Sequence, residues 1–141
     1  METTTTRPMM DTAASVTHAV LRIGAGLLFM QHGAQKLLGW FGGMGGPGQT
    51  VELMSRSGLA GVLELFGGAL IVLGVLTLPV AVILVLEMLA AYVLAHVGRG
   101  LAPIENGGEL ALLYALIFAF LAANGPGRWS VHGWLARRRA G

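Results

Sequence analysis

An apolar stretch at residues 59–95 limits the possible folds of this chain more than any other feature. It holds two charged residues, Glu64 and Glu87, among many leucines, valines and alanines. About 20 apolar residues cross the hydrocarbon core of a bilayer, so this stretch is too long for a single crossing. Pro79 lacks a backbone N–H and restricts the residue before it, which predicts a reversal of the chain at residues 77–79. We therefore expect two transmembrane helices, at residues 59–76 and 80–97.

Two further apolar segments flank this pair, at residues 13–38 and 110–123. A loop at residues 39–58, rich in glycine, follows the first of them, and Glu109 stands at the entrance of the second. The sequence Gly-Pro-Gly at residues 125–127 predicts the end of the last helix.

The expected fold is therefore all-α, an up-down bundle of four transmembrane helices. Its expected parts are a flexible N-terminal tail, a transmembrane domain and a basic C-terminal tail, at residues 1–12, 13–135 and 136–141.

The composition excludes a soluble protein. Hydrophobic residues make up 55% of the 141 residues and charged residues 11%, against about 25% charged in an ordinary soluble domain. The net charge of +2 does not indicate nucleic-acid binding, because the basic residues do not gather on one soluble face. The chain has no cysteine, so it has no disulfide, thiolate metal site or internal thiol relay. We expect the lipid bilayer as a partner and expect no metal site.

The distribution of basic residues predicts the orientation. Four crossings place both termini on one side of the membrane, together with Arg7, Arg128, Arg137, Arg138 and Arg139. The opposite loops hold Lys36, Arg56 and Arg99. Because cytoplasmic segments carry the excess of Lys and Arg, we expect both termini in the cytoplasm of a cell with an inner membrane.

Two deep charges predict a buried ion pair. At 1.5 Å per residue, Arg22 and Glu87 each lie roughly 12 Å from the same membrane face. A charge in mid-membrane is costly, so we expect the two to pair, directly or through water. Such a pair could fix helix register alone, or it could belong to a proton or substrate pathway.

A second polar group is expected at the opposite end of the bundle. Gly26, Phe29 and Gly33 share one face of the first span with Arg22 and Lys36. Glycines beside Glu64 permit close packing of the second span against the first. Five ionisable residues from four helices should therefore converge: His32, Lys36, Glu64, His96 and Glu109. We interpret His32, Glu64 and His96 as catalytic and Lys36 and Glu109 as substrate-binding. In the simpler interpretation, Lys36 and Glu109 reach the interface and His96 caps a helix.

Three segments carry a family resemblance: LRIGAGLLFMQHGAQKLLGWFGG at residues 21–43, ELFGGALIVLGVLT at 64–77 and GGELALLYALIFAFLAANGPGRWSV at 107–131. Together they resemble the DoxX family of integral membrane proteins. The resemblance implies a four-helix inner-membrane protein. It also implies a link to quinone-coupled sulfur oxidation or to complexes that handle thiol or oxidative stress.

Our leading hypothesis is a subunit or partner of a membrane redox system, with a quinone as the candidate cofactor and other membrane or envelope redox proteins as partners. Such a chain could be an oxidoreductase subunit. One alternative is a non-enzymatic assembly or scaffold protein, and another is a pathway for a small solute or protons. A homo-oligomer is compatible with each of them.

Overall fold

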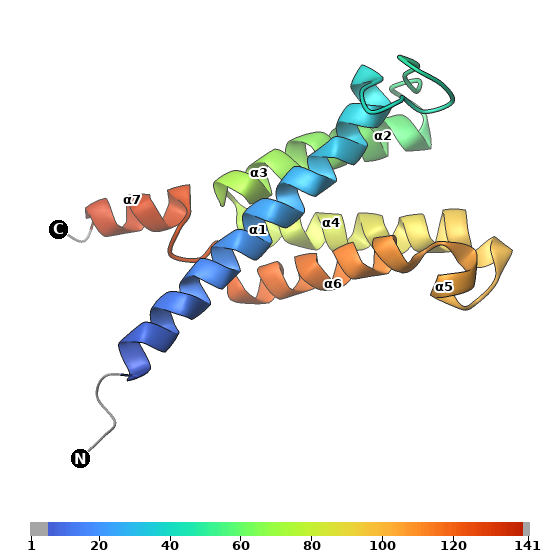
Figure 1. The fold of residues 1–141 in the computed structure, drawn as a ribbon. Coiled ribbons are helices and arrows are strands. Elements are labelled where there is room, and N and C mark those ends of the chain that lie inside the picture. Colours follow the sequence, from blue (N-terminus) through green and yellow to red (C-terminus); the bar gives the residue numbers. More distant parts are fainter. Residues whose placement is uncertain (1–5, 140–141) are drawn as a thin grey trace.

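The computed structural model describes residues 6–139, which form helices and contain no β-strand (Figure 1). The longest helix is α1, Thr6–Leu38. The second long helical unit, called a rod here, consists of α2 at Arg56–Val62, a π-helical turn η1 at Leu63–Gly67 and α3 at Gly68–Leu73. The third rod consists of α4 at Thr77–Ala91, a π-helical turn η2 at Tyr92–His96 and a 3-10 turn η3 at Val97–Arg99. The chain then forms α5, α6 and α7, at Pro103–Asn106, Glu109–Asn124 and Val131–Arg139.

The helices are long and apolar enough for a membrane protein. Three segments of the described chain qualify as spans: Asp11–Leu38, Arg56–Leu73 and Thr77–Arg99. The shorter apolar helix α6, Glu109–Asn124, is about 24 Å long at 1.5 Å per residue. All four hydrophobic segments predicted from the sequence are therefore present as helices.

The first helix begins earlier than predicted. Residues 6–12, which the sequence assigned to a flexible tail, are the first turns of α1, while the remaining tail residues 1–5 lie outside the described residues. At the other end, residues 136–139 of the predicted basic tail belong to α7, and residues 140–141 lie outside the described part.

The reversal between α3 and α4 lies just before the position predicted from Pro79. Gly74 and Leu76 adopt left-handed conformations, with φ of 67° and 49°, and α4 begins at Thr77. Pro79 therefore lies in the first turn of α4. Backbone N–H groups in that turn have no helical partner, so a proline costs little there. The predicted turn at residues 77–79 is wrong by a few residues for this reason.

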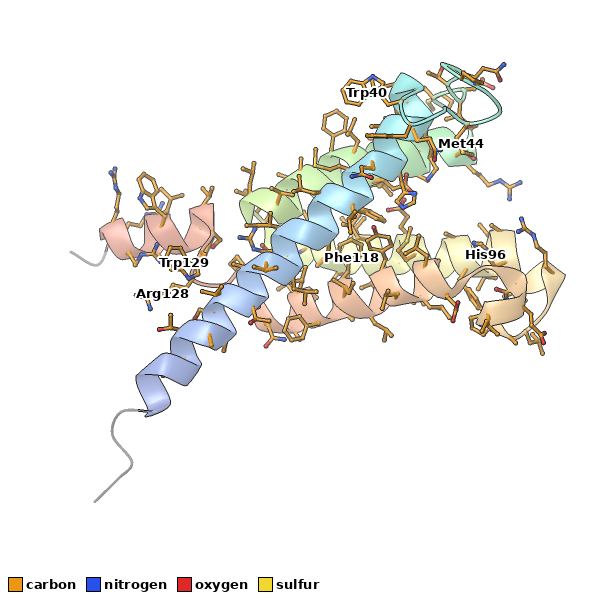
Figure 2. All side chains as sticks on the ribbon, in the orientation of Figure 1. Trp40, Met44, His96, Phe118, Arg128 and Trp129 are labelled. Atoms are coloured by element: carbon orange, nitrogen blue, oxygen red, sulfur yellow. The ribbon has the colours of Figure 1, made fainter. Side chains whose placement is uncertain are left out.

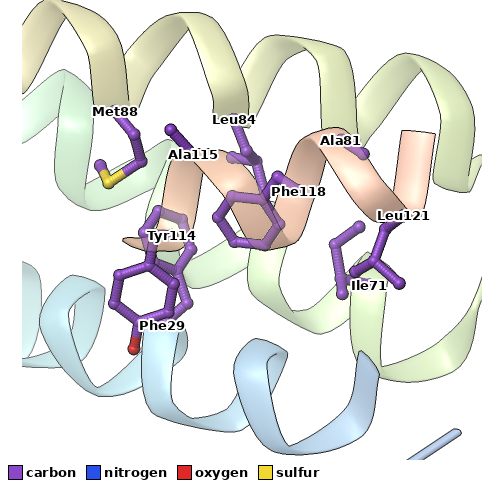
Figure 3. Close-up of a cluster of buried hydrophobic side chains, with 9 residues drawn as sticks. All are labelled: Phe29, Ile71, Ala81, Leu84, Met88, Tyr114, Ala115, Phe118 and Leu121. Carbon is purple, nitrogen blue, oxygen red and sulfur yellow. The ribbon is translucent and has the colours of Figure 1, made fainter. Parts of the chain in front are cut away.

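The helices pack as two pairs of antiparallel neighbours. α1 lies along α2, η1 and α3, and α4 lies along α6 (Figure 1). A cluster of buried side chains joins the two pairs (Figure 3). Its members come from all four rods: Phe29, Ile71, Ala81, Leu84, Met88, Tyr114, Ala115, Phe118 and Leu121.

Glycines allow α1 to approach the second rod closely. A Cβ on Gly33 would lie 2.5 Å from the backbone N of Leu65 and 2.7 Å from the carbonyl O of Gly61. A Cβ on Gly26 would lie 2.9 Å from the carbonyl O of Gly68. Because lipid tails are as apolar as leucine, helices in a bilayer associate through such close packing. The close packing of the second span that the glycine pattern predicted is confirmed.

Substitution of Gly33 tests this contact. We expect Gly33→Ala to lower the free energy of unfolding by about 1–3 kcal/mol, because the added methyl group must displace backbone atoms. Gly24 is the matched control, since a Cβ there meets nothing within 4 Å. Gly24→Ala should leave stability unchanged or raise it by up to about 1 kcal/mol through helix propensity. Unfolding of both variants in mixed detergent micelles measures the difference, and equal effects would contradict the packing.

Candidate functional site

A cleft of about 970 Å³ lies between the two helix pairs. Its walls come from α1, from α2 with η1, from α4 with η2, and from α6. Met44 in the glycine-rich loop and His96 at the end of η2 both line it, and Figure 2 shows them on opposite sides of the space between the pairs. Phe29, Met88 and Tyr114 belong both to its lining and to the buried core, so the core forms its floor.

The lining is mostly apolar but includes six charged or imidazole side chains: His32, Lys36, Arg56, Glu64, Glu87 and His96. Ligand pockets are commonly lined by apolar side chains with a few polar groups that orient the ligand. The cleft fits that description. Among the described residues, no group of three His, Asp or Glu side chains is arranged to hold a metal ion.

A buried ion pair lies in the wall formed by α1 and η1. Lys36 donates a hydrogen bond from Nζ to Oε1 of Glu64. The side chain of Glu64 is 5% exposed and that of Lys36 is 17% exposed. The second carboxylate oxygen of Glu64 is buried and accepts no hydrogen bond from the described chain. One oxygen of Glu64 is therefore paired with Lys36, and the other is buried without a partner in the described chain.

Glu87 lies in the opposite wall, on α4. Both of its carboxylate oxygens are buried, and within residues 6–139 neither has a hydrogen-bond partner. An unpartnered carboxylate in an apolar surrounding costs free energy. Glu87 therefore contributes to the cleft wall while its carboxyl group is buried and unpaired within the described chain.

The two histidines in the cleft have different surroundings. The ring of His32, on α1, meets the ring of Tyr114 edge to face, with centroids 6.0 Å apart. His96 Nδ1 lies 3.1 Å from the backbone O of Asn106, and its ring stacks on Tyr92. A carbonyl oxygen can only accept, so Nδ1 of His96 carries the proton and donates. In the neutral ring, Nε2 is then an acceptor.

Both π-helical turns of the described chain, η1 and η2, occur in the walls of the cleft. η1 contains Glu64 and η2 contains His96. π-helical turns are rare and are often found at functional sites, where they change the direction of a side chain. The sequence pattern did not predict these turns.

Arg22 and Glu87 do not pair, so that prediction is wrong. Arg22 is 1% exposed, and its Nη1 donates to the backbone O of Ile71 at 2.6 Å and to that of Val72. Its Nη2 donates to the backbone O of Trp129 at 2.5 Å. The first two carbonyls are near the end of α3, where the negative end of the helix dipole favours a cation; the Ile71 carbonyl also accepts from the N–H of Gly74 at 3.1 Å. Depth counting failed because α1 is longer than assumed and crosses α4 and α6 at an angle (Figure 1). The observation that motivated a proton or solute pathway is thereby lost.

Glu109 is not part of the cleft. It is exposed at the start of α6, while its neighbours Gly107 and Leu110 line the cavity. Asn106 lies in the connection between α4 and α6 and is 2% exposed, and its side chain holds the backbone of that connection in a tight turn. Its side chain donates to the backbone O of Gly100 at 2.8 Å and accepts from the N–H of Gly108 at 2.8 Å. The Asn-Gly-Gly sequence was the available signal for this turn.

Four of the five residues predicted at this end of the bundle therefore line one cleft: His32, Lys36, Glu64 and His96. Glu87, which the sequence analysis predicted to pair with Arg22, also lines this cleft. Sequence reasoning also missed Arg56, Met44 and Tyr114 as lining residues.

Comparison with known proteins gives the family. The DoxX family model matches residues 17–97, which include all six charged or imidazole side chains of the cleft. The chain belongs to the DoxX family. This confirms the resemblance seen in the sequence.

Two relatives of this DoxX protein are similar over most of their length. A protein of Haemophilus influenzae, named as uncharacterized, is 42% identical over 116 aligned residues, which cover 77% of this chain and 83% of the relative. An uncharacterized membrane protein of Mycobacterium tuberculosis is 34% identical over 141 aligned residues, covering 84% of this chain and 80% of the relative. No solved structure matches the chain. The name of the Mycobacterium relative and the long apolar helices of this chain both describe a membrane protein.

Proposed function

We propose that this DoxX protein is a subunit or partner of a membrane redox system and that its cleft binds the headgroup of a quinone. The observation that carries the proposal is the placement of the Lys36–Glu64 pair. A buried ion pair and the unpartnered Glu87 lie in the walls of a large cavity whose lining is otherwise mostly apolar. Charges of this kind are rare inside membrane helices and commonly mark functional sites.

The shape of the cleft suits an amphipathic molecule that arrives from the bilayer. Its volume of about 970 Å³ is near the upper end of the range for ligand pockets, about 300–1,000 Å³. A polar ring would lie among the ionisable side chains, and an isoprenoid or alkyl tail would follow the leucines and alanines toward the lipid.

The side chains of the cleft supply what a quinone headgroup needs. A quinone takes up two electrons and two protons when it is reduced, so its site needs hydrogen bonds to the ring oxygens and a route for protons. His32, His96 and Glu64 are titratable groups that can donate, accept and pass protons. Lys36 holds a fixed positive charge. The chain has no cysteine, so any thiol chemistry belongs to a partner protein.

The proposal includes a topology. We place α6 across the membrane as the fourth span of an up-down bundle. The basic residues near both ends of the chain, Arg7, Arg128 and Arg137–Arg139, then face the cytoplasm. The mouth of the cleft opens on the opposite side of the inner membrane.

Binding of a soluble quinone analogue tests the proposal. Purified protein in lipid nanodiscs should bind a decyl benzoquinone saturably, as measured by calorimetry. His32→Ala and Glu64→Ala should each weaken binding at least about tenfold, the equivalent of one good hydrogen bond. Glu109→Gln is the control, because Glu109 is exposed and outside the cleft.

Two results would overturn the proposal. One is the absence of saturable binding to the native protein. The other is binding that none of these variants changes while His32→Ala and Glu64→Ala lower stability. The second result would support the scaffold alternative, in which the buried charges serve packing.

A further inference from the structure

We infer that Tyr114 binds the ligand of the cleft directly, by donating a hydrogen bond from its hydroxyl group to a ring oxygen of the quinone beside His32. This inference rests on the proposed function and adds a binding residue that the sequence pattern did not single out. It follows from the position of a polar group that has no partner, at the boundary between the apolar core and the cleft.

The apolar core holds the ring of Tyr114 in place. Tyr114 is 6% exposed, and its ring centroid lies 4.9 Å from that of Phe29 and 5.8 Å from that of Phe118. The rings of Phe29 and Phe118 meet edge to face, with centroids 4.8 Å apart. Figure 3 shows the rings of Tyr114 and Phe29 packed together at one end of this core. Because a tyrosine ring has few rotatable bonds, this packing also fixes the position of the hydroxyl group.

The hydroxyl group of Tyr114 adds nothing to that packing. Within residues 6–139 it forms no hydrogen bond, and unlike the carboxylate oxygens of Glu87 it is not fully buried. A phenylalanine would fill the same space in the core. A hydroxyl group without a partner in an apolar surrounding costs free energy, and a ligand that accepts its hydrogen bond removes that cost.

The cleft is the polar side of Tyr114. This residue also borders the smaller groove between α1 and α6, but the other side chains that line that groove are apolar. Toward the cleft, the ring of His32 stands edge to face against that of Tyr114, with centroids 6.0 Å apart and 89° between the planes. In the described chain the ring nitrogens of His32 are likewise neither hydrogen-bonded nor fully buried. A phenol and an imidazole, both unengaged, therefore share one part of the lining.

These two groups match the chemistry of a quinone carbonyl. The oxygen of a quinone is an acceptor, the phenol hydroxyl is a donor, and one nitrogen of the imidazole can donate as well. The cleft has two further free donors, Arg56 and Ser57, but both belong to the first turn of α2 and are more exposed than Tyr114. Water competes for those two, whereas a hydrogen bond to a group packed in the core is the stronger interaction.

The chain has two tyrosines, which provide a matched pair of variants. Tyr92 does not line the cleft, and its hydroxyl donates to the backbone O of Leu101 at 3.0 Å and accepts from Asn106 at 3.3 Å. Tyr114→Phe and Tyr92→Phe each remove one hydroxyl group and keep the ring. We expect Tyr92→Phe to lower the melting temperature, because it breaks hydrogen bonds within the chain. Tyr114→Phe should melt at the native temperature or above it, because no such bond is lost.

Binding should respond in the opposite way. Calorimetry of a decyl benzoquinone with protein in nanodiscs should show that Tyr114→Phe weakens binding at least about tenfold, the equivalent of one good hydrogen bond. Tyr92→Phe should bind within about twofold of the native protein. A purely structural role of Tyr114 would not produce a loss of affinity in the variant whose stability is unchanged.

The possible failures are distinguishable. If Tyr114→Phe binds the benzoquinone as tightly as the native protein does, the inference is overturned and the proposed function stands. Equal weakening in Tyr114→Phe and Tyr92→Phe also overturns the inference, since the loss then follows from the fold and not from the cleft. If the native protein shows no saturable binding, the proposed function fails together with the inference.

Discussion

Replacing Lys36 with methionine is expected to lower the free energy of unfolding by about 3–5 kcal/mol. Lys36 pairs with Glu64, whose side chain is 5% exposed and whose second oxygen has no partner in the described structure. Removal of one member of a buried pair leaves the other charge without compensation, and the cost of that charge produces the loss. Unfolding in mixed detergent micelles, followed by circular dichroism, measures it.

The double variant separates the cost of an unpaired charge from the value of the pair. Lys36→Met with Glu64→Leu removes both charges, and we expect it to be within about 1–2 kcal/mol of the native protein, because apolar replacements of buried ion pairs are often nearly neutral. Arg56→Met is the matched control, since Arg56 lines the same cleft but is exposed. It should change stability by less than about 0.5 kcal/mol. A single Lys36→Met variant as stable as native would show that the pair is not buried as described.

The same double variant distinguishes function from packing. If the pair serves a ligand, the stable double variant should lose benzoquinone binding at least about tenfold, because neither a donor nor an acceptor remains at that wall. If the pair serves only helix register, the double variant should bind as the native protein does. Stability and binding measured on one sample therefore answer the two questions separately.

Filling the cleft is expected to abolish binding without disturbing the fold. Ala60 lines the cleft one turn before Glu64 on the same rod. In Ala60→Phe the new ring would occupy space that the native chain leaves open, and we expect benzoquinone affinity to fall at least about a hundredfold. Stability should change by less than about 1 kcal/mol, because the ring meets a cavity and not packed atoms.

Ala119→Phe is the control for added bulk. Ala119 is exposed on α6 and does not line the cleft, so this variant should bind as the native protein does. Native affinity in Ala60→Phe, with the variant folded, would place the binding site elsewhere.

The helices were predictable because long runs of apolar residues are a strong sequence signal for membrane-spanning helices. Long apolar segments separated by glycine, proline and polar residues predicted three of the hydrophobic rods to within three residues at each end, and the first helix begins seven residues earlier than predicted. The close contact of α1 with the second rod followed from Gly26, Gly33, Gly61 and Gly68, since small residues at helical spacing form a face where backbones can meet.

The pairing of buried charges was not predictable in the same way. Counting residues from each end assumes straight, parallel helices, and α1 is long and crosses α4 and α6 at an angle (Figure 1). Arg22 binds backbone carbonyls at the end of α3 and at Trp129, and backbone acceptors leave no trace in a sequence. Glu87 consequently remained free to line the cleft.

The group of polar residues at one end of the bundle was predicted only in part. His32, Lys36, Glu64 and His96 lie near helix ends that meet at one side of the fold, and all four line the cleft. Glu109 has the same position in the sequence pattern, but the tight turn held by Asn106 directs it outward. The π-helical turns that carry Glu64 and His96 insert one extra residue per turn, which no periodicity in these segments indicated.

Photolabelling with an azide-bearing decyl benzoquinone tests most directly whether the cleft is the binding site. Protein in nanodiscs is irradiated with the probe, and the labelled peptides are identified by mass spectrometry. We predict that the label attaches within the segments 57–64 and 83–96, which contribute to the lining of the cleft, and that excess unlabelled decyl benzoquinone prevents it. Label in the smaller apolar groove between α1 and α6, at Leu28, Leu113 or Ile117, or label spread evenly over lipid-facing residues and unaffected by competitor, would contradict the account.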